Sequence, residues 1–370
     1  MLPTAAHQPS STSPADRPGR LPHWQVSVRA ALREHLPFLG GIAAYWLIAL
    51  MAGVSAVAVP TRALALAVLV WLALVAVHLL VTVLERPGRT PIQPWVNLSA
   101  WLRRRARDPG EALRILLAVC GIGFLMLTFG EFKPLLPDLG TYRWDGLFAT
   151  LDHALHGGVD PWVLTRAIPG GQTVSALLDH TYLLWYPALA VGHLAAILFA
   201  RPVVRMQYLL SVLLMWSVAG TGLAILFASG GPVYFHALTG EPGTFAPLID
   251  DLLRSHLAAP VLQAQLWDLH VAGNPVAFSG ISAMPSVHVG IAALIAFLAL
   301  RLHPVLGIVG EAYWLLIMVG SVHLGWHYAV DGYFATLFAA GSWWVTGRLA
   351  RWWLRSGPPH GQVGDGMASR

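Results

Sequence analysis

Charged side chains are scarce in this sequence, and lysine is almost missing. Asp, Glu, Lys and Arg make up 11% of the 370 residues, whereas 56% are hydrophobic. Soluble domains carry about 25% charged residues, so the composition argues against a soluble protein and favours a polytopic membrane protein. Lys133 is the only lysine, and the net charge of +5 therefore rests on arginine. Arginine-rich loops are typical of the cytoplasmic side of membrane proteins, so we expect no nucleic-acid partner.

The sequence also lacks a second cysteine and a recognisable signal peptide. Cys120 has no possible partner within the chain, which excludes an internal disulfide. Residues 1–20 are rich in Pro, Ser and Ala, and no short apolar core with a cleavage site follows them. We therefore expect residues 1–35 to form a disordered, basic cytoplasmic tail, with a second cytoplasmic tail at residues 351–370.

Eight apolar runs are each long enough to cross a hydrocarbon layer roughly 30 Å thick at ~1.5 Å per helical residue. They cover about residues 36–59, 63–84, 113–129, 182–200, 203–227, 285–302, 305–323 and 328–349. The sequence thus predicts an all-α fold, a polytopic membrane helical bundle of about eight transmembrane helices. We expect one membrane-embedded catalytic domain at residues 36–350.

The polar segment 130–172 contains apolar residues at helical spacing, among them Trp144, Phe148, Leu151 and Leu155. This pattern predicts an interfacial amphipathic helix.

The charges of the loops give an independent prediction of topology. With the amino terminus inside, basic residues fill every cytoplasmic segment, including Arg103–Arg107, Arg201 with Arg205, and Arg351 with Arg355. The opposite side receives segments 130–172 and 229–282, where acids equal or outnumber bases. This alternation follows the positive-inside bias. We expect a multi-pass plasma-membrane protein with both termini cytoplasmic and with His288, His327 and Asp331 on the extracytoplasmic face.

His327 and Asp331 are four residues apart, so on a helix they lie on one face, a turn from each other. A carboxylate that accepts the proton of one imidazole nitrogen raises the basicity of the other nitrogen. Such a histidine is a competent nucleophile or general base. A purely structural pair at a helix end is the alternative, but ionisable groups inside membrane segments usually line a cavity or a pathway.

Pro285, Ser286 and His288 open another apolar run. Proline suits the first turn of a helix and serine can cap its free amides, so this start predicts an anion site. His288 would stand beside the bound anion and could protonate a departing oxygen. A plain helix cap beside a chance histidine is the alternative.

These two fragments resemble motifs of the type 2 phosphatidate phosphatase superfamily of membrane lipid-phosphate enzymes. Its second motif usually reads Pro-Ser-Gly-His and its third Ser-Arg-x5-His-x3-Asp; here the chain has Pro285-Ser-Val-His288 and His327-Tyr-Ala-Val-Asp331. The resemblance covers roughly the last 150 residues and implies a catalytic core at 177–350. It implies that His327 is the nucleophile and forms a phosphohistidine, that Asp331 orients it, and that His288 is the acid for the leaving group.

The chain departs from the family pattern at its phosphate-binding positions. Val287 replaces the glycine, Gly320-Ser321 replaces Ser-Arg, and the first motif, Lys-x6-Arg-Pro, is not found. In its place stands Ser229-Gly-Gly-Pro-Val-Tyr-Phe235, and this combination looks like the branch that contains fungal inositol phosphorylceramide synthase. We expect the substrate phosphate to contact Ser286, Val287, Tyr234, His236, Arg143 and Arg254, with Lys133 ranked behind these.

The prediction is an enzyme that transfers a phospho-head group, inositol-phosphate-like, to or from a lipid, with an alcohol or water as acceptor and no cofactor or metal. A simple phosphatase acting on phosphatidate or polyprenyl phosphate is one alternative.

A metal-dependent membrane hydrolase is another alternative, because His323, His327, Asp331 and His288 are potential ligands for zinc or iron. Gly325 argues against it by predicting a turn between His323 and His327. A non-catalytic lipid-binding or transport protein is the third.

Overall fold

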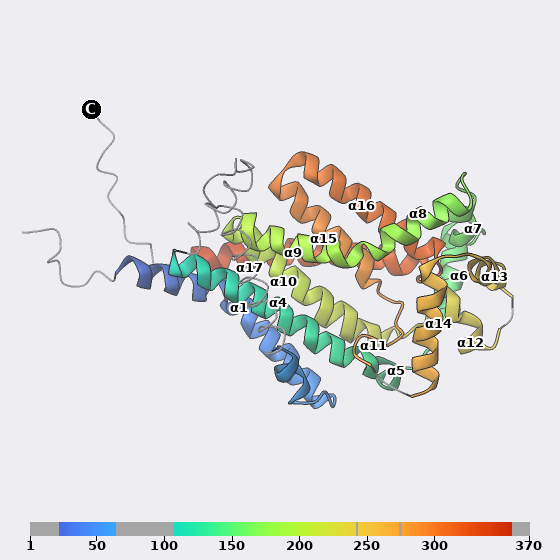
Figure 1. The fold of residues 1–370 in the computed structure, drawn as a ribbon, viewed down its shortest axis with the longest axis horizontal. Helices are drawn as coiled ribbons and strands as arrows, with labels where there is room; N and C mark the ends of the chain where they lie inside the picture. The colour runs from blue at the N-terminus through green and yellow to red at the C-terminus, as the bar shows by residue number, and fades with distance from the viewer. Residues whose placement is uncertain (1–21, 64–106, 242, 274–275, 357–370) are drawn as a thin grey trace, which may run out of the picture.

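The computed structural model describes residues 22–63, 107–241, 243–273 and 276–356, and every regular element in these ranges is helical. Figure 1 shows an elongated bundle in which the long helices run along the horizontal axis and short helices gather at one end. The predicted all-α membrane bundle is confirmed in its class. The predicted run at 63–84 and the arginines at 103–105 lie outside the described residues.

Long helices account for the other seven predicted runs. They are α1 (His23–Met51), α4 (Pro109–Phe132), α8 (Gln172–Leu183) with α9 (Trp185–Phe199), α10 (Pro202–Leu214), α15 (Val287–Leu302), α16 (Pro304–His323) and α17 (Ala329–Arg355). α10 continues through the π-helical segment η2 (Met215–Leu223) into α11 (Ala224–Leu226). Among the described helices four are long and apolar enough to cross a membrane, or five if the bent α8–α9 pair, with its 42° angle, is one span.

Helix α1 begins at His23, ahead of the run predicted from Leu36, so part of the expected tail is helical. The reason is a buried ion pair. Glu34 accepts a hydrogen bond from Arg205 Nε at 2.7 Å and lies 3.2 Å from Arg114 Nε. These contacts join α1 to α10 and α4. The pattern of apolar runs does not reveal them, because they link charged residues that are far apart in the sequence.

Helix α15 is the centre of the bundle. Its residues from Val289 to Leu294 are all buried, and it packs against α16, α17, α9 and α10. Polar groups link its neighbours: Gln207 donates to the Trp343 carbonyl, and the hydroxyls of Ser211 and Thr346 lie 2.8 Å apart. Between helices in an apolar surrounding such bonds add to packing.

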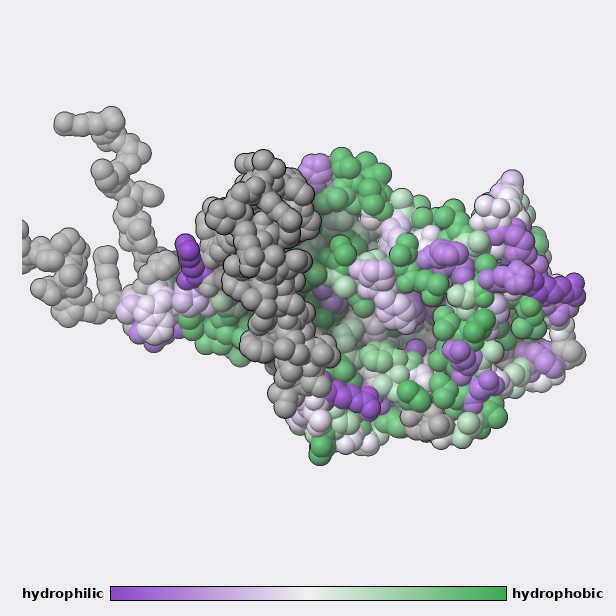
Figure 2. All heavy atoms as spheres, viewed as in Figure 1, coloured by the Kyte–Doolittle hydropathy of each residue, from purple (hydrophilic) through white to green (hydrophobic). Residues whose placement is uncertain are grey.

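Short helices cover the end of the bundle at which α15 and α17 begin (Figure 1). They are η1 (Lys133–Leu135), α5 (Leu136–Leu139), α6 (Asp145–Leu155), α7 (Pro161–Arg166), η3 (Pro232–Tyr234), α12 (Phe235–Thr239), α13 (Ala246–Arg254) and α14 (Ala258–Val271). In the view of Figure 2, hydrophilic side chains gather at this end, and hydrophobic ones cover much of the bundle's side.

The helix predicted in segment 130–172 is α6. Its buried face carries Asp145, Phe148 and Asp152, whereas Leu151 and Leu155 face outward and are exposed. The two acids turn inward because they accept hydrogen bonds from other segments, as described below. The outward leucines leave an apolar face of the kind that suits a membrane interface.

Candidate active site

Chain reversal brings the predicted catalytic residues to one end of the bundle. α15 starts at Val287, α16 ends at His323 and α17 starts at Ala329, with a turn at Gly325, whose φ is +73°. Nδ1 of His327 lies 3.4 Å from Oδ2 of Asp331, and the rings of His288 and His327 have centroids 6.3 Å apart. The structure therefore places His288, His327 and Asp331 together.

The carboxylate of Asp331 is held from the helix start. It is fully buried, and its Oδ2 accepts the backbone N–H of Tyr328 at 3.0 Å. Because Nδ1 of His327 faces this carboxylate, Nε2 is the nitrogen left for other partners. His327 is one of the residues that line the adjoining cavity.

Aromatic rings fix the position of His288. Its ring stacks on Tyr182 at a centroid distance of 5.1 Å and lies 4.3 Å from the ring of Trp185. Nε1 of Trp185 also donates to the His288 carbonyl. These contacts come from α8 and α9, so the bent helix pair orients the second histidine.

The start of α15 is capped as the sequence predicts. Oγ of Ser286 accepts from the Val289 amide at 3.4 Å, and the Ser286 amide donates to the Asp331 carbonyl at 3.3 Å. The second bond ties α15 to α17. It also engages the Ser286 amide, which leaves the amides of Val287 and His288 as the first-turn donors without an acceptor inside the helix.

The segment that begins at Ser229 fastens the two histidine-bearing loops together. Ser229 accepts the Ala283 amide at its carbonyl and the Met284 amide at its hydroxyl. Gly231 lies against the other loop: its φ is +92°, and a Cβ there would come within 2.6 Å of the Trp326 carbonyl oxygen. Only glycine fits this position.

Two buried aspartates of α6 bind the loop at Gly230–Gly231 and the start of α17. Asp145 accepts the amides of Gly230 and Gly231 and the hydroxyl of Tyr328. Asp152 accepts the amides of Ala329 and Val330 at 2.7 and 2.9 Å, which caps α17 from another helix. Burial raises the pKa of Asp152 to about 6, and burial also raises the pKa of Asp145.

Sequence reasoning missed both aspartates. Their seven-residue spacing puts them on one face of α6, which was the available signal.

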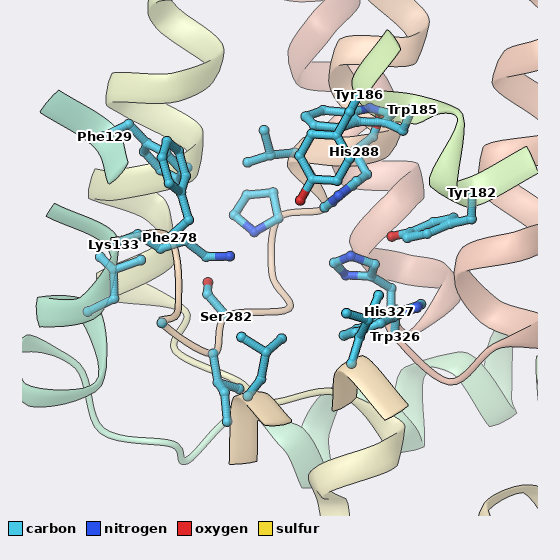
Figure 3. A pocket seen from close by; sticks show the side chains of 18 of the residues that line it. Phe129, Lys133, Tyr182, Trp185, Tyr186, Phe278, Ser282, His288, Trp326 and His327 are labelled. Carbon is cyan, nitrogen blue, oxygen red and sulfur yellow. The ribbon is translucent and has the colours of Figure 1, made fainter. Parts of the chain in front are cut away.

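A cavity of about 410 Å³ opens beside the two histidines. Figure 3 shows Phe129, Lys133 and Phe278 on one wall and Tyr182, Trp185, His288 and His327 on the other. Most of its lining is apolar or aromatic, with contributions from α4, α8, α9, η2 and α14. The site thus combines a polar end with an apolar interior, which suits a ligand that has a polar group on an apolar chain.

The predicted phosphate-contacting residues divide into two groups. Val287 and Tyr234 line the cavity, although the Tyr234 hydroxyl donates to the Gln263 carbonyl, and Ser286 is buried behind it as the helix cap. Three residues lie outside the cavity lining: Arg143 lies over the ring of Trp144, His236 contacts the Glu241 carbonyl, and Arg254 is exposed 3.8 Å from Asp250.

Lys133 was ranked last from the sequence. Among the described residues that line the cavity, it is the only one that is a lysine or an arginine. The signal was present in the sequence: a lone lysine, in a chain that otherwise uses arginine, lies just beyond the apolar run at 113–129. His323, the residue added in the metal hypothesis, turns away from the pair, and its Nε2 lies 2.8 Å from Oγ of Ser175.

The helical membrane bundle thus presents two histidines to an apolar cavity, and a buried aspartate lies behind one of them. The family model described as the PAP2 superfamily matches residues 147–345, and the chain belongs to this superfamily. It is therefore an enzyme of phosphatase or phosphotransferase type that acts on lipid phosphates in a membrane. No curated protein and no solved structure matches the chain.

Proposed function

We propose that the protein transfers a phosphoryl-containing head group between lipids through a covalent phosphohistidine on His327. The observation that carries this proposal is the position of the His327 ring. Its Nδ1 lies 3.4 Å from Oδ2 of Asp331, and His327 lines the cavity. That arrangement directs the Nδ1 proton to the carboxylate and leaves a lone pair on Nε2.

The reaction has two steps. In the first, Nε2 of His327 attacks phosphorus and a P–N bond forms while the P–O bond to the leaving group breaks. His288 gives a proton to the departing oxygen. In the second, an alcohol or water attacks phosphorus, His288 takes its proton, and the P–N bond breaks. Asp331 stabilises the positive charge of the His327 ring in both steps.

The apolar cavity would hold part of the lipid chain. The free amides of Val287 and His288 point outward from the start of α15, where the helix dipole favours an anion. We assign them to the phosphate oxygens. Ring centroids 6.3 Å apart allow His288 and His327 to contact the same phosphoryl group from two sides.

The identity of the acceptor divides transferase from phosphatase. Met284-Pro-Ser-Val-His288 and the segment from Ser229 to Tyr234 resemble the inositol phosphorylceramide synthase branch, and this supports transfer of an inositol-phosphate-like group to a lipid alcohol. Hydrolysis of phosphatidate or polyprenyl phosphate uses the same first step, with water in the second.

We further propose that the site opens on the extracytoplasmic side of the plasma membrane, with both termini cytoplasmic. The described basic residues favour this orientation: Arg201, Arg301 and Arg351 lie at the helix ends opposite the site. Single cysteines at Thr244, on the site side, or at Ser356, at the opposite end of α17, introduced into a Cys120→Ala background, test it. We expect an impermeant maleimide to label Thr244→Cys in intact cells, and labelling restricted to lysed cells would reverse the orientation.

The decisive test of the reaction uses purified protein, labelled phosphatidylinositol or phosphatidate, and candidate alcohols. We expect product formation that vanadate inhibits and that His327→Ala and His288→Ala abolish. A new phospholipid that forms only with a lipid alcohol identifies the transferase, whereas release of free phosphate identifies the phosphatase. Full activity of His327→Ala would contradict both.

A further inference from the structure

We propose that Lys133 is the cation that binds the substrate phosphate, across the cavity from His327 and His288. This assignment rests on the proposed function for its chemistry. Its starting point is position: Lys133 lines the cavity wall that faces the two histidines (Figure 3). An anion placed between these walls contacts the ammonium on one side and the nucleophile on the other.

The ammonium of Lys133 has no protein partner among the described residues. The closest acid in sequence, Glu131, forms an ion pair with Arg62, and Asp138 is exposed on α5. A partly buried ammonium beside an apolar cavity is costly to desolvate unless an anion neutralises it. A phosphate bound in the cavity provides that neutralisation.

Other cations do not compete for this role in the described chain. Arg143 and Arg254 lie outside the cavity lining, and Arg166 forms an ion pair with Asp251. The two histidines are assigned to proton transfer and attack. Lys133 is therefore the lysine or arginine side chain that the described site offers to a phosphate.

Close backbone packing holds Lys133, the first residue of η1 after α4, beside a site built from later segments. The Phe278 amide donates to the Gly130 carbonyl at 2.9 Å. Gly280 lies directly on the backbone of Lys133, where a Cβ would come within 2.0 Å of the carbonyl oxygen. Tyr142 adds a third tie by donating to the Ile281 carbonyl. The loop that leads to His288 is thus fastened beside Lys133.

The same face of α4 and its extension continues as apolar cavity wall. Met126, Phe129 and Leu136 line the cavity with Lys133, at spacings of three and four residues that share one helical face. A lipid whose phosphate meets Lys133 can lay its chain along this stripe. Lys133 precedes the family-matched region 147–345, so this cation is supplied from outside that region.

The experiment compares Lys133→Met, Lys133→Arg and the matched control Arg143→Gln in the full-length protein. Orthovanadate and inorganic phosphate are the probes, and the readouts are the vanadate-induced rise in unfolding temperature and kcat/KM for the lipid phosphate. We expect Lys133→Met to weaken vanadate binding at least tenfold and to lower kcat/KM by a factor of ten or more. Lys133→Arg restores part of both, and Arg143→Gln changes neither.

Methionine keeps the apolar stem, so we expect Lys133→Met to fold. Its unfolding temperature without anion checks this. An equal vanadate response in Lys133→Met and wild type, or no response in wild type, overturns the proposal. Because the chain has one lysine, peptide mapping after amine-specific labelling adds a direct readout: vanadate should slow modification of Lys133. Vanadate protection without any phosphohistidine on His327 would overturn the proposed function and leave the cation assignment standing.

Discussion

Replacing Asp331 by asparagine isolates the charge of the carboxylate from its structural role. Oδ2 accepts the Tyr328 amide and faces Nδ1 of His327, whereas Oδ1 is buried without a hydrogen-bond partner in the described chain. An asparagine with its oxygen at the Oδ2 position keeps the bond to Tyr328. The substitution therefore removes the negative charge and leaves the start of α17 in place.

The size of the effect follows from the 3.4 Å separation of His327 and Asp331. Two unit charges at that distance interact by about 5 kcal/mol at an effective dielectric constant of about 20. Both side chains are buried, at 7% and 0% exposure, so solvent screens them little. With half to all of a unit positive charge on the ring in the transition state, the loss is about 10²- to 10⁴-fold in kcat.

The assay is single-turnover formation of the phosphoenzyme from labelled lipid phosphate, with the unfolding temperature measured in parallel. We expect Asp331→Asn to slow the first step and to leave the unfolding temperature near that of wild type. Glu34→Gln is the control. Glu34 is another buried carboxylate in an ion pair, but it lies at the end of the bundle opposite the histidine site, near the starts of α1, α4 and α10. Phosphoenzyme formation in Asp331→Asn at more than a tenth of the wild-type rate would refute the reasoning.

Three further predictions concern the supports of the site and the fold. Burial raises the pKa of Asp152 from 3.8 to about 6, so the folded protein binds this proton more tightly than the unfolded chain. The free energy of unfolding then falls by about 3 kcal/mol between about pH 4 and pH 6; Asp152→Asn should flatten this dependence in thermal unfolding from pH 4 to pH 7, and an unchanged slope would contradict the assignment. Gly280→Ala should displace the loop from Lys133 and lower kcat/KM at least tenfold, whereas Gly146→Ala, whose added Cβ meets nothing within 4 Å, should leave it unchanged. Glu34→Gln strands Arg205 without its carboxylate and should destabilise the fold by about 3 kcal/mol with the specific activity of the folded protein retained; a loss of activity at full stability would show that our separation of fold from site is wrong.

The helices and the grouping of His288, His327 and Asp331 could be predicted because their signals are local. Apolar runs mark the long helices, and His327 and Asp331 are only four residues apart, with His327 just before the N-cap of α17 and Asp331 in its first turn. His288 was placed with them by counting membrane crossings, which brings the starts of α15 and α17 to one end. Loop charge and hydropathy suffice for such an inference.

The supports of the site could not be predicted in this way because they join segments far apart in the chain. Asp145 meets Gly230 and Gly231, and Asp152 meets the start of α17; a sequence presents both acids as members of a polar loop. The cavity-lining cation was ranked last for the same reason. Arg143 and Arg254 lie in the polar loops but outside the cavity lining, whereas Lys133 lines the cavity beside the close approach of Gly280.

The most direct measurement is identification of the phosphorylated residue after rapid quenching. Purified protein is mixed with ³²P-labelled lipid phosphate, quenched at alkaline pH to preserve phosphohistidine, digested, and mapped by mass spectrometry. The account predicts an acid-labile phosphate on the peptide that contains His327, absent from His327→Ala and accumulating in His288→Ala when a substrate with a good leaving group is used. Phosphate on another residue, or turnover with no phosphoenzyme in any variant, would contradict it.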